Sequence, residues 1–294
     1  MTPSLDCVVC LQRQCLEAAR YATDDVALQA QILESAMKEI LRHGIPAPSP
    51  IVGTDVHRLV REMSGVADPY YKHKKRFNRL ALDNEEAIRD WIRSADDQFE
   101  ATVRVAIAGN AIDFAIEGVS EQTVSQMIDH AAMTPLVGSP TELRREIENA
   151  ENILYLADNA GEIVYDKFLV ELLVSPEFDK STTVVTRGAP IINDALLEDA
   201  EEIGLTKITN VVTNGGDGLG VIFDLVSDDF KERFMNADLV IAKGLANLES
   251  LWSVSSERRD KKIAFLFKAK CEFIAEQIGC DLGDLCIQIR TPRN

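Results

Sequence analysis

The chain has 294 residues, a formal net charge of −17 at pH 7 and 46% hydrophobic residues. This length suits one large domain or two ordinary ones with a real core, and the acidic balance argues against non-specific binding to nucleic acid or to anionic membranes. No apolar stretch is long enough to span a bilayer, and the N-terminus lacks the pattern of a secretory signal. We therefore expect a cytoplasmic protein whose six cysteines are reduced thiols.

The first half of the chain shows helical spacing of its apolar residues and no convincing strand alternation. The ranges that favour helices are 7–22, 25–43, 53–64 and 84–104. Thr54 is a candidate N-cap for the third range, and a turn-rich segment with three prolines precedes it. The sequence therefore predicts a helical domain over residues 1–148.

After residue 150, short apolar runs alternate with helical patterns. The apolar runs are 153–157, 182–186, 208–213, 238–242, 263–267 and 285–289. The helical patterns between several of them are 162–174, 194–203, 227–236 and 271–279. This alternation is typical of βαβ units, so we predict an α/β protein in which residues 149–294 form a Rossmann-like α/β/α domain with a mostly parallel sheet of about six strands.

The first turn of this predicted sheet carries polar residues that point to metal chemistry. Asp158 and Asn159 follow a buried apolar run, and Gly161 and Glu162 lie at the start of the next helix. Ligands bind at this edge of parallel sheets, and a helix N-terminus favours anions. We therefore expect a divalent metal at Asp158 and Asn159 that bridges to a phosphate, with helix capping by Asp158 as the alternative.

The second turn repeats the pattern with Asn193 and Asp194 near the end of the next predicted strand. If the two strands are neighbours, Asp158, Asn159 and Asp194 can converge on one site with two carboxylates and an amide oxygen. Such an oxygen-rich set suits Mg²⁺ or Mn²⁺ better than zinc. The alternative is that Asp194 lies at the N-cap or in the first turn of a helix.

Later turns add candidate phosphate ligands at the same edge. The turn at residues 214–220, which contains Asp217, is either a phosphate cradle or an ordinary glycine-rich turn, and it is not a Walker A loop. Lys243 follows the fourth apolar run, and Lys268 and Lys270 follow the fifth. A lysine binds phosphate as a point charge, although a single lysine is usually just solvated.

The helical half contains two further signals. A glycine and Asn110 interrupt an apolar run, so either a helix ends there or Asn110 and Asp113 face something polar. Cys7 and Cys10 share a helix face and could join Cys271 in a three-thiolate cluster, with inert buried cysteines as the first alternative. All four histidines lie outside the predicted Rossmann-like half, so Ser–His or Cys–His catalysis has no support.

Several segments together resemble a known family. They are Asp68-Pro69-Tyr70, Gly109-Asn110-x-x-Asp113-Phe114, Asp158-Asn159-Ala160-Gly161-Glu162, Arg187-Gly188-x-Pro190-x-x-Asn193-Asp194, Lys243-Gly244-x-x-Asn247-x-Glu249-Ser250 and Lys268-Ala269-Lys270-Cys271. The set is similar to the damage-control phosphatases, in which a helical N-terminal domain lies on a Rossmann-like domain. The resemblance runs essentially end to end, and the N-terminal Cys-x-x-Cys suggests the prokaryotic cysteine-bearing subgroup. It departs at Phe273, where a proline is expected.

The resemblance implies a Mn, Mg, Co or Ni ion held by Asp158, Asn159 and Asp194, and phosphorylated metabolites as substrates. We therefore predict a phosphatase for sugar phosphates or damaged phosphometabolites, in which Asp158 or a metal-bound water attacks and Lys268 neutralises phosphoryl charge. The other predicted substrate or phosphate contacts are Gly161, Glu162, Asn193, Asp217, Lys243, Asn247, Asn110 and Asp113. The alternatives are an S-adenosylmethionine-dependent carboxyl methyltransferase, which a eukaryotic branch of the family suggests, and a non-enzymatic metal or redox protein built on the cysteines.

Overall fold

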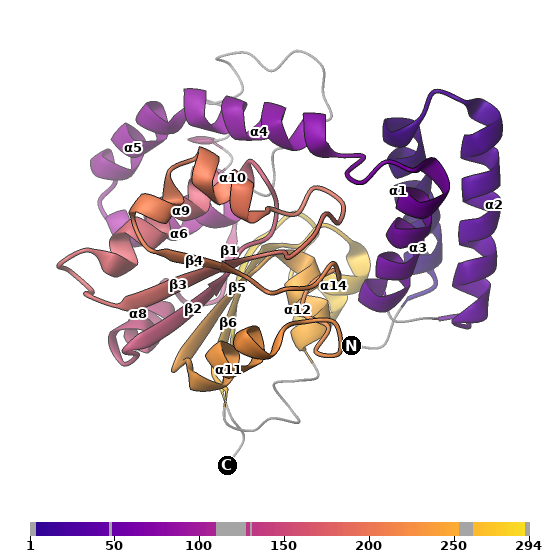
Figure 1. The fold of residues 1–294 in the computed structure, drawn as a ribbon. Coiled ribbons are helices and arrows are strands. Elements are labelled where there is room, and N and C mark those ends of the chain that lie inside the picture. Colours follow the sequence, from indigo (N-terminus) through magenta and orange to yellow (C-terminus); the bar gives the residue numbers. More distant parts are fainter. Residues whose placement is uncertain (1–3, 47–48, 110–127, 130, 253–260, 292–294) are drawn as a thin grey trace.

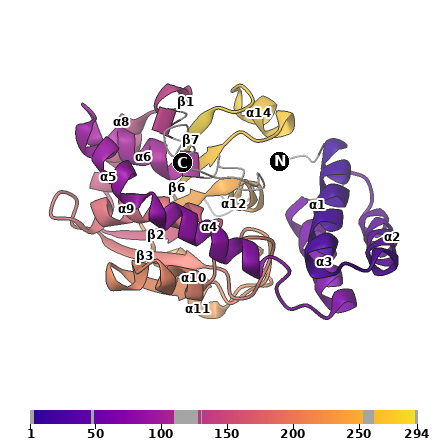
Figure 2. The same ribbon diagram turned by 90° about the horizontal axis from the view of Figure 1, so that it is seen from above.

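The computed structural model describes residues 4–46, 49–109, 128–129, 131–252 and 261–291. They form a small three-helix bundle beside a larger body in which helices cover both faces of a sheet (Figures 1 and 2). The bundle consists of α1 (Asp6–Ala22), α2 (Val26–Arg42) and α3 (Ser49–Ser64). None of the described helices is both long enough and apolar enough to cross a membrane.

The bundle helices pack through apolar faces whose buried residues recur at helical spacing. These residues are Leu11, Cys15, Ala18 and Ala19 on α1, Ile32, Ala36 and Ile40 on α2, and Val52, Val56 and Val60 on α3. Because α3 begins at Ser49, the predicted N-cap role of Thr54 is wrong. The Thr54 hydroxyl instead donates to the carbonyl of Pro50 (2.7 Å) and accepts from the backbone N–H of Leu219 (3.0 Å), which joins the bundle to the body.

One sheet of seven strands, in the order β1-β7-β6-β5-β2-β3-β4, forms the centre of the body. The strands are β1 (Leu136–Val137), β2 (Asn152–Leu156), β3 (Ser181–Thr186), β4 (Asn210–Thr213), β5 (Leu239–Lys243), β6 (Ile263–Lys268) and β7 (Leu285–Arg290). All neighbouring strands are parallel except β6 and β7. The predicted α/β class with a mostly parallel sheet is confirmed, and the unexpected strand is the two-residue β1 in the half predicted to be helical.

Side chains alternate between the two faces of the sheet, and each face has its own hydrophobic core. On β2, Ile153 and Tyr155 pack on one face, and Leu154 and Leu156 pack on the other. The first face is covered by α4 (Tyr71–Asp83), α5 (Glu85–Ser94), α6 (Gln98–Ala108), α8 (Pro140–Glu148), α9 (Glu162–Val174) and α10 (Leu197–Glu202). The second face is covered by α11 (Asp228–Asn236), α12 (Gly244–Leu251) and α14 (Glu272–Ile278).

The helices α4 to α6 precede the predicted domain boundary at residue 148, yet they pack into the body. Phe99 and Val103 of α6 belong to the same hydrophobic core as Ile163 and Leu169 of α9. Hydrophobic packing therefore groups residues 71–108 with the sheet and leaves the bundle of α1 to α3 as the unit with a separate core. The division of the chain at residue 148 into two folding units stays a prediction.

The strand order identifies where a ligand can bind. From β2 the chain continues to β3 on one side, and it later returns to β5 on the other side of β2. Connections that diverge in this way open a crevice at the carboxyl ends of the two strands, where doubly wound sheets bind their ligands. Asp158 lies just beyond β2, and Gly244 lies directly after β5.

Candidate functional site

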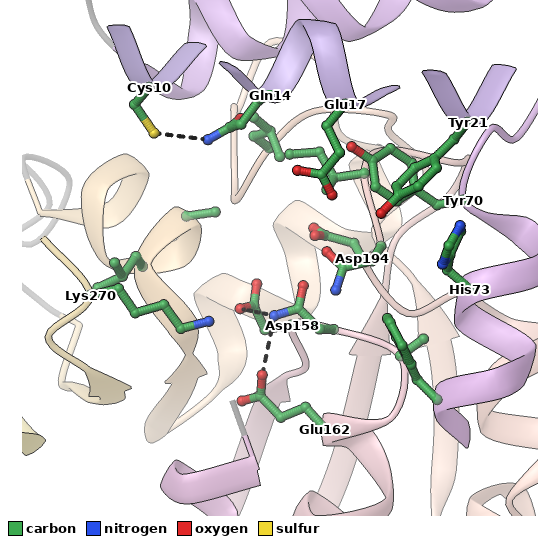
Figure 3. Close-up of a pocket in the computed structure, with 18 of the residues that line it drawn as sticks. Cys10, Gln14, Glu17, Tyr21, Tyr70, His73, Asp158, Glu162, Asp194 and Lys270 are labelled. Atoms are coloured by element: carbon green, nitrogen blue, oxygen red, sulfur yellow. Dashed lines mark hydrogen bonds between the residues drawn. The ribbon is translucent and has the colours of Figure 1, made fainter. Parts of the chain in front are cut away.

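A cavity of about 470 Å³ lies at this edge of the sheet, between the body and the bundle. Asp158, Glu162 and Asp194 on its floor face the side chains of α1 across the cavity (Figure 3). The roof consists of Cys10, Arg13, Gln14, Glu17 and Tyr21 of α1, and one wall consists of Tyr70 with His73 and Phe77 of α4. The site is therefore formed by segments from both halves of the chain.

The backbone brings the two acidic turns together. The N–H of Ala195 donates to the carbonyl of Asp158 (2.7 Å), and the N–H of Ala160 donates to the carbonyl of Asn193 (2.8 Å). A β-bridge pairs the residues Asn159 and Asp194 in antiparallel orientation. The turns after β2 and β3 are thus held side by side as the sequence predicts for neighbouring strands.

Neither acidic side chain caps a helix. The N-cap of α9 is Gly161, and the N-cap of α10 is Leu196. Asp158 instead lies against the first residue of α12, because a Cβ atom at Gly244 would lie 1.9 Å from its Oδ2. Gly244 also has a φ of +75°, which favours glycine. The close approach of Asp158 to this helix therefore requires a glycine at position 244.

Beside Asp158, a buried hydrogen-bond network orients Asn159. Its Nδ2 donates to Asp158 Oδ2 (3.0 Å) and to Glu162 Oε2 (3.2 Å), which turns the carbonyl oxygen of the amide away from both carboxylates. The other oxygen of Glu162 accepts from the fully buried Lys243 (2.6 Å). Lys243 also donates to Asp166 and to a backbone carbonyl of α6. The Oδ1 of Asp166 accepts a second hydrogen bond, from the Tyr155 hydroxyl.

On the other side of the floor, Arg187 holds Asp194. Its Nε donates to Asp194 Oδ2 (2.6 Å), and its Nη2 donates to Asn247 Oδ1 (3.2 Å). The same Nη2 lies 4.0 Å from Asp158 Oδ1. The Nδ2 atom of Asn247 donates to the backbone carbonyls of Ala157 and Lys243, so this amide links β2, β5 and the turn after β3.

The electrostatics of the floor suit a divalent cation. Burial, followed by the charges of Asp194 and Glu162, raises the pKa of Asp158 well above its ordinary value, while Arg187 and Lys270 oppose this. Burial also raises the pKa of Asp194 against the charge of Arg187. Buried carboxylates that repel each other are stabilised by a cation, and carboxylate and amide oxygens are the ligands that Mg²⁺ and Mn²⁺ prefer. Asp158, Asn159 and Asp194 therefore fit the predicted metal.

The three lysines near the strand ends differ in their surroundings. Lys243 points into the buried network and does not line the cavity. Lys268, the last residue of β6, is not among the described lining residues either. Lys270 does line the cavity and extends toward Asp158 (Figure 3). The geometry thus favours Lys270 as the phosphate-facing cation, although the sequence led us to choose Lys268.

Gly161 and Asp217, which were predicted to contact the phosphate, form hydrogen bonds with other parts of the protein. The N–H of Gly161 donates to Oδ1 of Asn78 on α4 (2.7 Å). Asp217 Oδ2 accepts from Arg58 (2.8 Å) and from Arg61 (2.7 Å), both on α3. The turn at residues 214–220 therefore anchors the bundle to the body, and its carboxylate faces α3 rather than the floor of the cavity.

The remaining predicted substrate contacts differ in where they lie. Glu162 and Asn193 line the cavity, whereas Asn247 is buried behind it. Asn110 and Asp113 lie outside the described residues. The structure thus brings together Asp158, Asn159, Asp194 and these two lining residues from the predicted set.

The roof of the cavity escaped the sequence analysis. Cys10, Gln14, Glu17 and Tyr21 recur every three or four residues and form a polar stripe along α1 that lines the cavity. This spacing was visible in the sequence as helical periodicity. Local sequence does not show which distant surface such a stripe will face. The predicted contacts from the first half of the chain were Asn110 and Asp113, with Cys7 and Cys10 in the thiol cluster, and only Cys10 of these is seen to line the cavity among the described residues.

Cys7, Cys10 and Cys271 do not lie within 4.8 Å of one another as a group, although the charges of Cys7 and Cys10 act on Cys271. Among the described residues, Glu39, His43 and Asp55 in the bundle form a group of three potential metal ligands. Their ligand atoms lie within 4.8 Å of one another. Arginines already pair with both carboxylates of that group. Of the predicted thiol cluster, Cys10 lines the cavity and its Sγ accepts from a glutamine of α1, while Cys271 is exposed and Cys7 is half-buried.

A doubly wound sheet with buried carboxylates at its switch point defines a Rossmann-like class of ligand-binding proteins. The model of the family described as "Damage-control phosphatase ARMT1-like domain" matches residues 4–286. The match spans nearly the whole chain, and the chain belongs to this family.

Named relatives and a solved structure agree with this assignment. The chain is 34% identical to a "Damage-control phosphatase" of Archaeoglobus fulgidus, over 96% of this chain and 97% of that protein. It is 33% identical to a damage-control phosphatase of Pyrococcus horikoshii, over 97% of each chain. An uncharacterized protein of Methanocaldococcus jannaschii is 36% identical over 95% of this chain and 92% of its own length. The crystal structure of a DUF89 family protein from Pyrococcus horikoshii superposes with a TM-score of 0.89 at 31% identity, covering 99% of this chain and 100% of that one.

Proposed function

We propose that this protein is a divalent-metal-dependent phosphatase that hydrolyses phosphomonoesters of small metabolites. The observation that carries the proposal is the convergence of Asp158, Asn159 and Asp194 at the switch point of the sheet, with Lys270 directed at the same floor. Membership of a phosphatase family and the printed names of two relatives support it. Sugar phosphates and damaged phosphometabolites are the proposed substrates.

The residues of the site divide the task between them. Asp158, Asn159 and Asp194 would hold the metal, which when bound supplies Lewis-acid polarisation of a phosphoryl oxygen. Lys270 lies where it can bind the phosphate and neutralise charge that develops on it, the role first expected for Lys268. Arg187 holds Asp194 in place by its 2.6 Å bond. The metal can be Mn, Mg, Co or Ni.

In the net reaction an oxygen of water bonds to phosphorus, the ester P–O bond breaks and the alcohol leaves with a proton. Two attacking groups fit the floor: the carboxylate of Asp158, through a phosphoenzyme that water then hydrolyses, or a water molecule directly. Trapping a phosphoenzyme in a single turnover that disappears in Asp158→Asn would select the first. Its absence while product forms would select the second.

The structure supports the two alternative functions less well than the phosphatase. A methyltransferase that uses S-adenosylmethionine needs an acid after the second strand to bind the adenosine. That position holds Arg187, which is bonded to Asp194. A thiolate metal site needs its sulfur atoms close together, and Cys7, Cys10 and Cys271 do not form such a group within 4.8 Å.

Phosphate release by chelator-stripped protein tests the proposal. p-Nitrophenyl phosphate and a panel of sugar phosphates are offered with Mg²⁺, Mn²⁺, Co²⁺ or Ni²⁺ restored singly. The expected result is metal-dependent turnover that is lost in both Asp158→Asn and Asp194→Asn. Absence of turnover with every metal, from protein shown to be folded, would reject the proposed function.

A further inference from the structure

The cavity differs in charge between its two ends. Lys270 extends over one end of the floor, below Cys10 at the start of the α1 stripe (Figure 3). At the other end, Glu17 points down from α1 toward Asp194, beside the rings of Tyr21 and Tyr70. A dianionic phosphate is attracted to the cationic end and repelled by a carboxylate, so this arrangement orients a phosphate ester along the cavity.

The end away from Lys270 is an aromatic wall. The ring centroids of Tyr21 and His73 are 3.9 Å apart, with planes inclined by 35°, and the ring of Tyr70 meets that of Tyr21 edge-on at 5.0 Å. Tyr70 is only 6% exposed and still lines the cavity. Aromatic rings pack well against C–H surfaces, and the phenol group also provides a hydrogen-bonding atom.

The charge of Glu17 is not balanced by an ion pair. Within the described part of the chain, no cation forms a salt bridge with Glu17, not even Arg13 one turn before it on the same helix. Burial, followed by the charge of Glu17, raises the pKa of Tyr70, in keeping with the position of this carboxylate beside the aromatic wall. An unbalanced carboxylate accepts hydrogen bonds from hydroxyl groups and repels a second anion.

We propose that Glu17, Tyr21, Tyr70 and His73 form a specificity wall that binds the hydroxylated organic part of the phosphate ester and rejects organic parts that carry a second negative charge. The inference rests on the proposed phosphatase function and goes beyond it by assigning the end of the cavity that selects the substrate. The phosphate lies toward Lys270, and the hydroxyl groups of the leaving alcohol lie under Glu17.

A matched pair of substrates tests the inference on the intact, metal-loaded protein. Glucose 1-phosphate and glucuronic acid 1-phosphate differ by one carboxylate in the organic part. The expected preference of the wild type for glucose 1-phosphate, as a ratio of kcat/KM values, is about tenfold or more, and Glu17→Gln reduces this ratio about five- to tenfold because it removes one repulsive charge. The matched control is Glu34→Gln, which removes the same charge from an exposed position on α2 away from the cavity and is expected to leave the ratio unchanged.

Each other outcome overturns the inference in a recognisable way. Equal turnover of the two substrates by the wild type, or an unchanged ratio in Glu17→Gln, would show that Glu17 does not select the organic part. Loss of turnover of both substrates in equal proportion would place Glu17 in the reaction itself. Absence of turnover of every ester would instead remove the proposed function, and this inference with it.

Discussion

The backbone N–H of Ala195 donates a hydrogen bond of 2.7 Å to the carbonyl oxygen of Asp158. Together with the bridge between Asn159 and Asp194, this bond fixes the turns after β2 and β3 side by side. The backbones that carry these two acidic side chains are therefore held close together. The charge of Asp194 contributes to the raised pKa of Asp158, and a cation bound at this position would reduce the repulsion between the two carboxylates.

Gly244→Ala is expected to lower activity on the order of 100-fold while leaving the protein folded. The new Cβ would lie 1.9 Å from Asp158 Oδ2, so either the carboxylate or the start of α12 must move. Displacing a catalytic group by about 1 Å costs on the order of 100-fold in rate, and kcat/KM for phosphate release measures the loss.

Gly279→Ala is the matched control for this substitution. Gly279 also has a positive φ, of +81°, but a Cβ there would meet nothing within 4 Å. The backbone strain is therefore comparable, about 1 kcal/mol, without a collision at the site. Wild-type kcat/KM in Gly279→Ala and a large loss in Gly244→Ala are expected, and a fully active Gly244→Ala would contradict the placement of Asp158.

Asp158→Asn is expected to stabilise the metal-free protein as it destroys activity. A carboxyl whose pKa is higher in the folded state binds more protons there than in the unfolded chain. Stability of the wild type therefore falls as pH rises from the ordinary Asp value of 3.8 through the raised folded pKa. The asparagine removes this cost, so the gain in free energy of unfolding is expected to be about 1–3 kcal/mol at pH 8 and smaller at pH 5.

Urea unfolding in the presence of a chelator, at both pH values, measures this effect. Asp24→Asn, at an exposed position between α1 and α2, is the control and is expected to change stability by less than about 0.5 kcal/mol. If Asp158→Asn is less stable than the wild type at pH 8, the negative charge of Asp158 is already stabilised by its neighbours in the metal-free protein.

Much of the fold could be predicted from the sequence because parallel strands covered on both faces are continuous apolar runs. The six predicted runs coincide with β2 to β7 within a few residues. The strand β1 has only two residues, too few for any pattern. Periodicity identified helices in the first half of the chain, but it does not reveal that α6 packs on α9 while α1 packs on α3.

The site, like the fold, could be predicted where local sequence patterns determine it and not where it depends on tertiary packing. Asp158, Asn159 and Asp194 were predicted together because the ends of neighbouring parallel strands must meet. The direction of a side chain at a strand end is not fixed by its position, so Lys243 points into the buried network and Lys270 lies in the cavity. The contribution of Glu17 depends on the docking of the bundle through contacts such as that between Arg61 and Asp217, which no local pattern encodes.

Lys270→Gln is expected to weaken phosphate binding more than Lys268→Gln does. Lys270 lines the cavity and extends toward Asp158, whereas Lys268 does not line it. Loss of a charged hydrogen bond to phosphate costs about 1.5–3 kcal/mol, so the inhibition constant of inorganic phosphate is expected to rise at least about tenfold in Lys270→Gln. A larger rise in Lys268→Gln would restore the assignment made from the sequence.

Lys243→Met is expected to act on stability rather than directly on phosphate binding. Burial lowers the pKa of Lys243, but the charges of Asp166 and Glu162 outweigh this and raise it, so the ammonium is charged between two buried carboxylates. Removing it leaves both carboxylates uncompensated, which costs about 3–5 kcal/mol in free energy of unfolding. Lys72→Met, at an exposed position on α4, is the control and is expected to have little effect.

The double variant Lys243→Met/Asp166→Asn separates the buried network from the phosphate site. It removes one of the uncompensated charges, so urea unfolding is expected to show that part of the lost stability returns. If Lys243 instead bound phosphate, the second substitution would restore nothing, and the inhibition constant of inorganic phosphate would rise equally in the single and double variants. Recovery of stability together with a smaller rise in that constant would show that Lys243 supports Glu162, and through it Asn159, from behind the cavity floor.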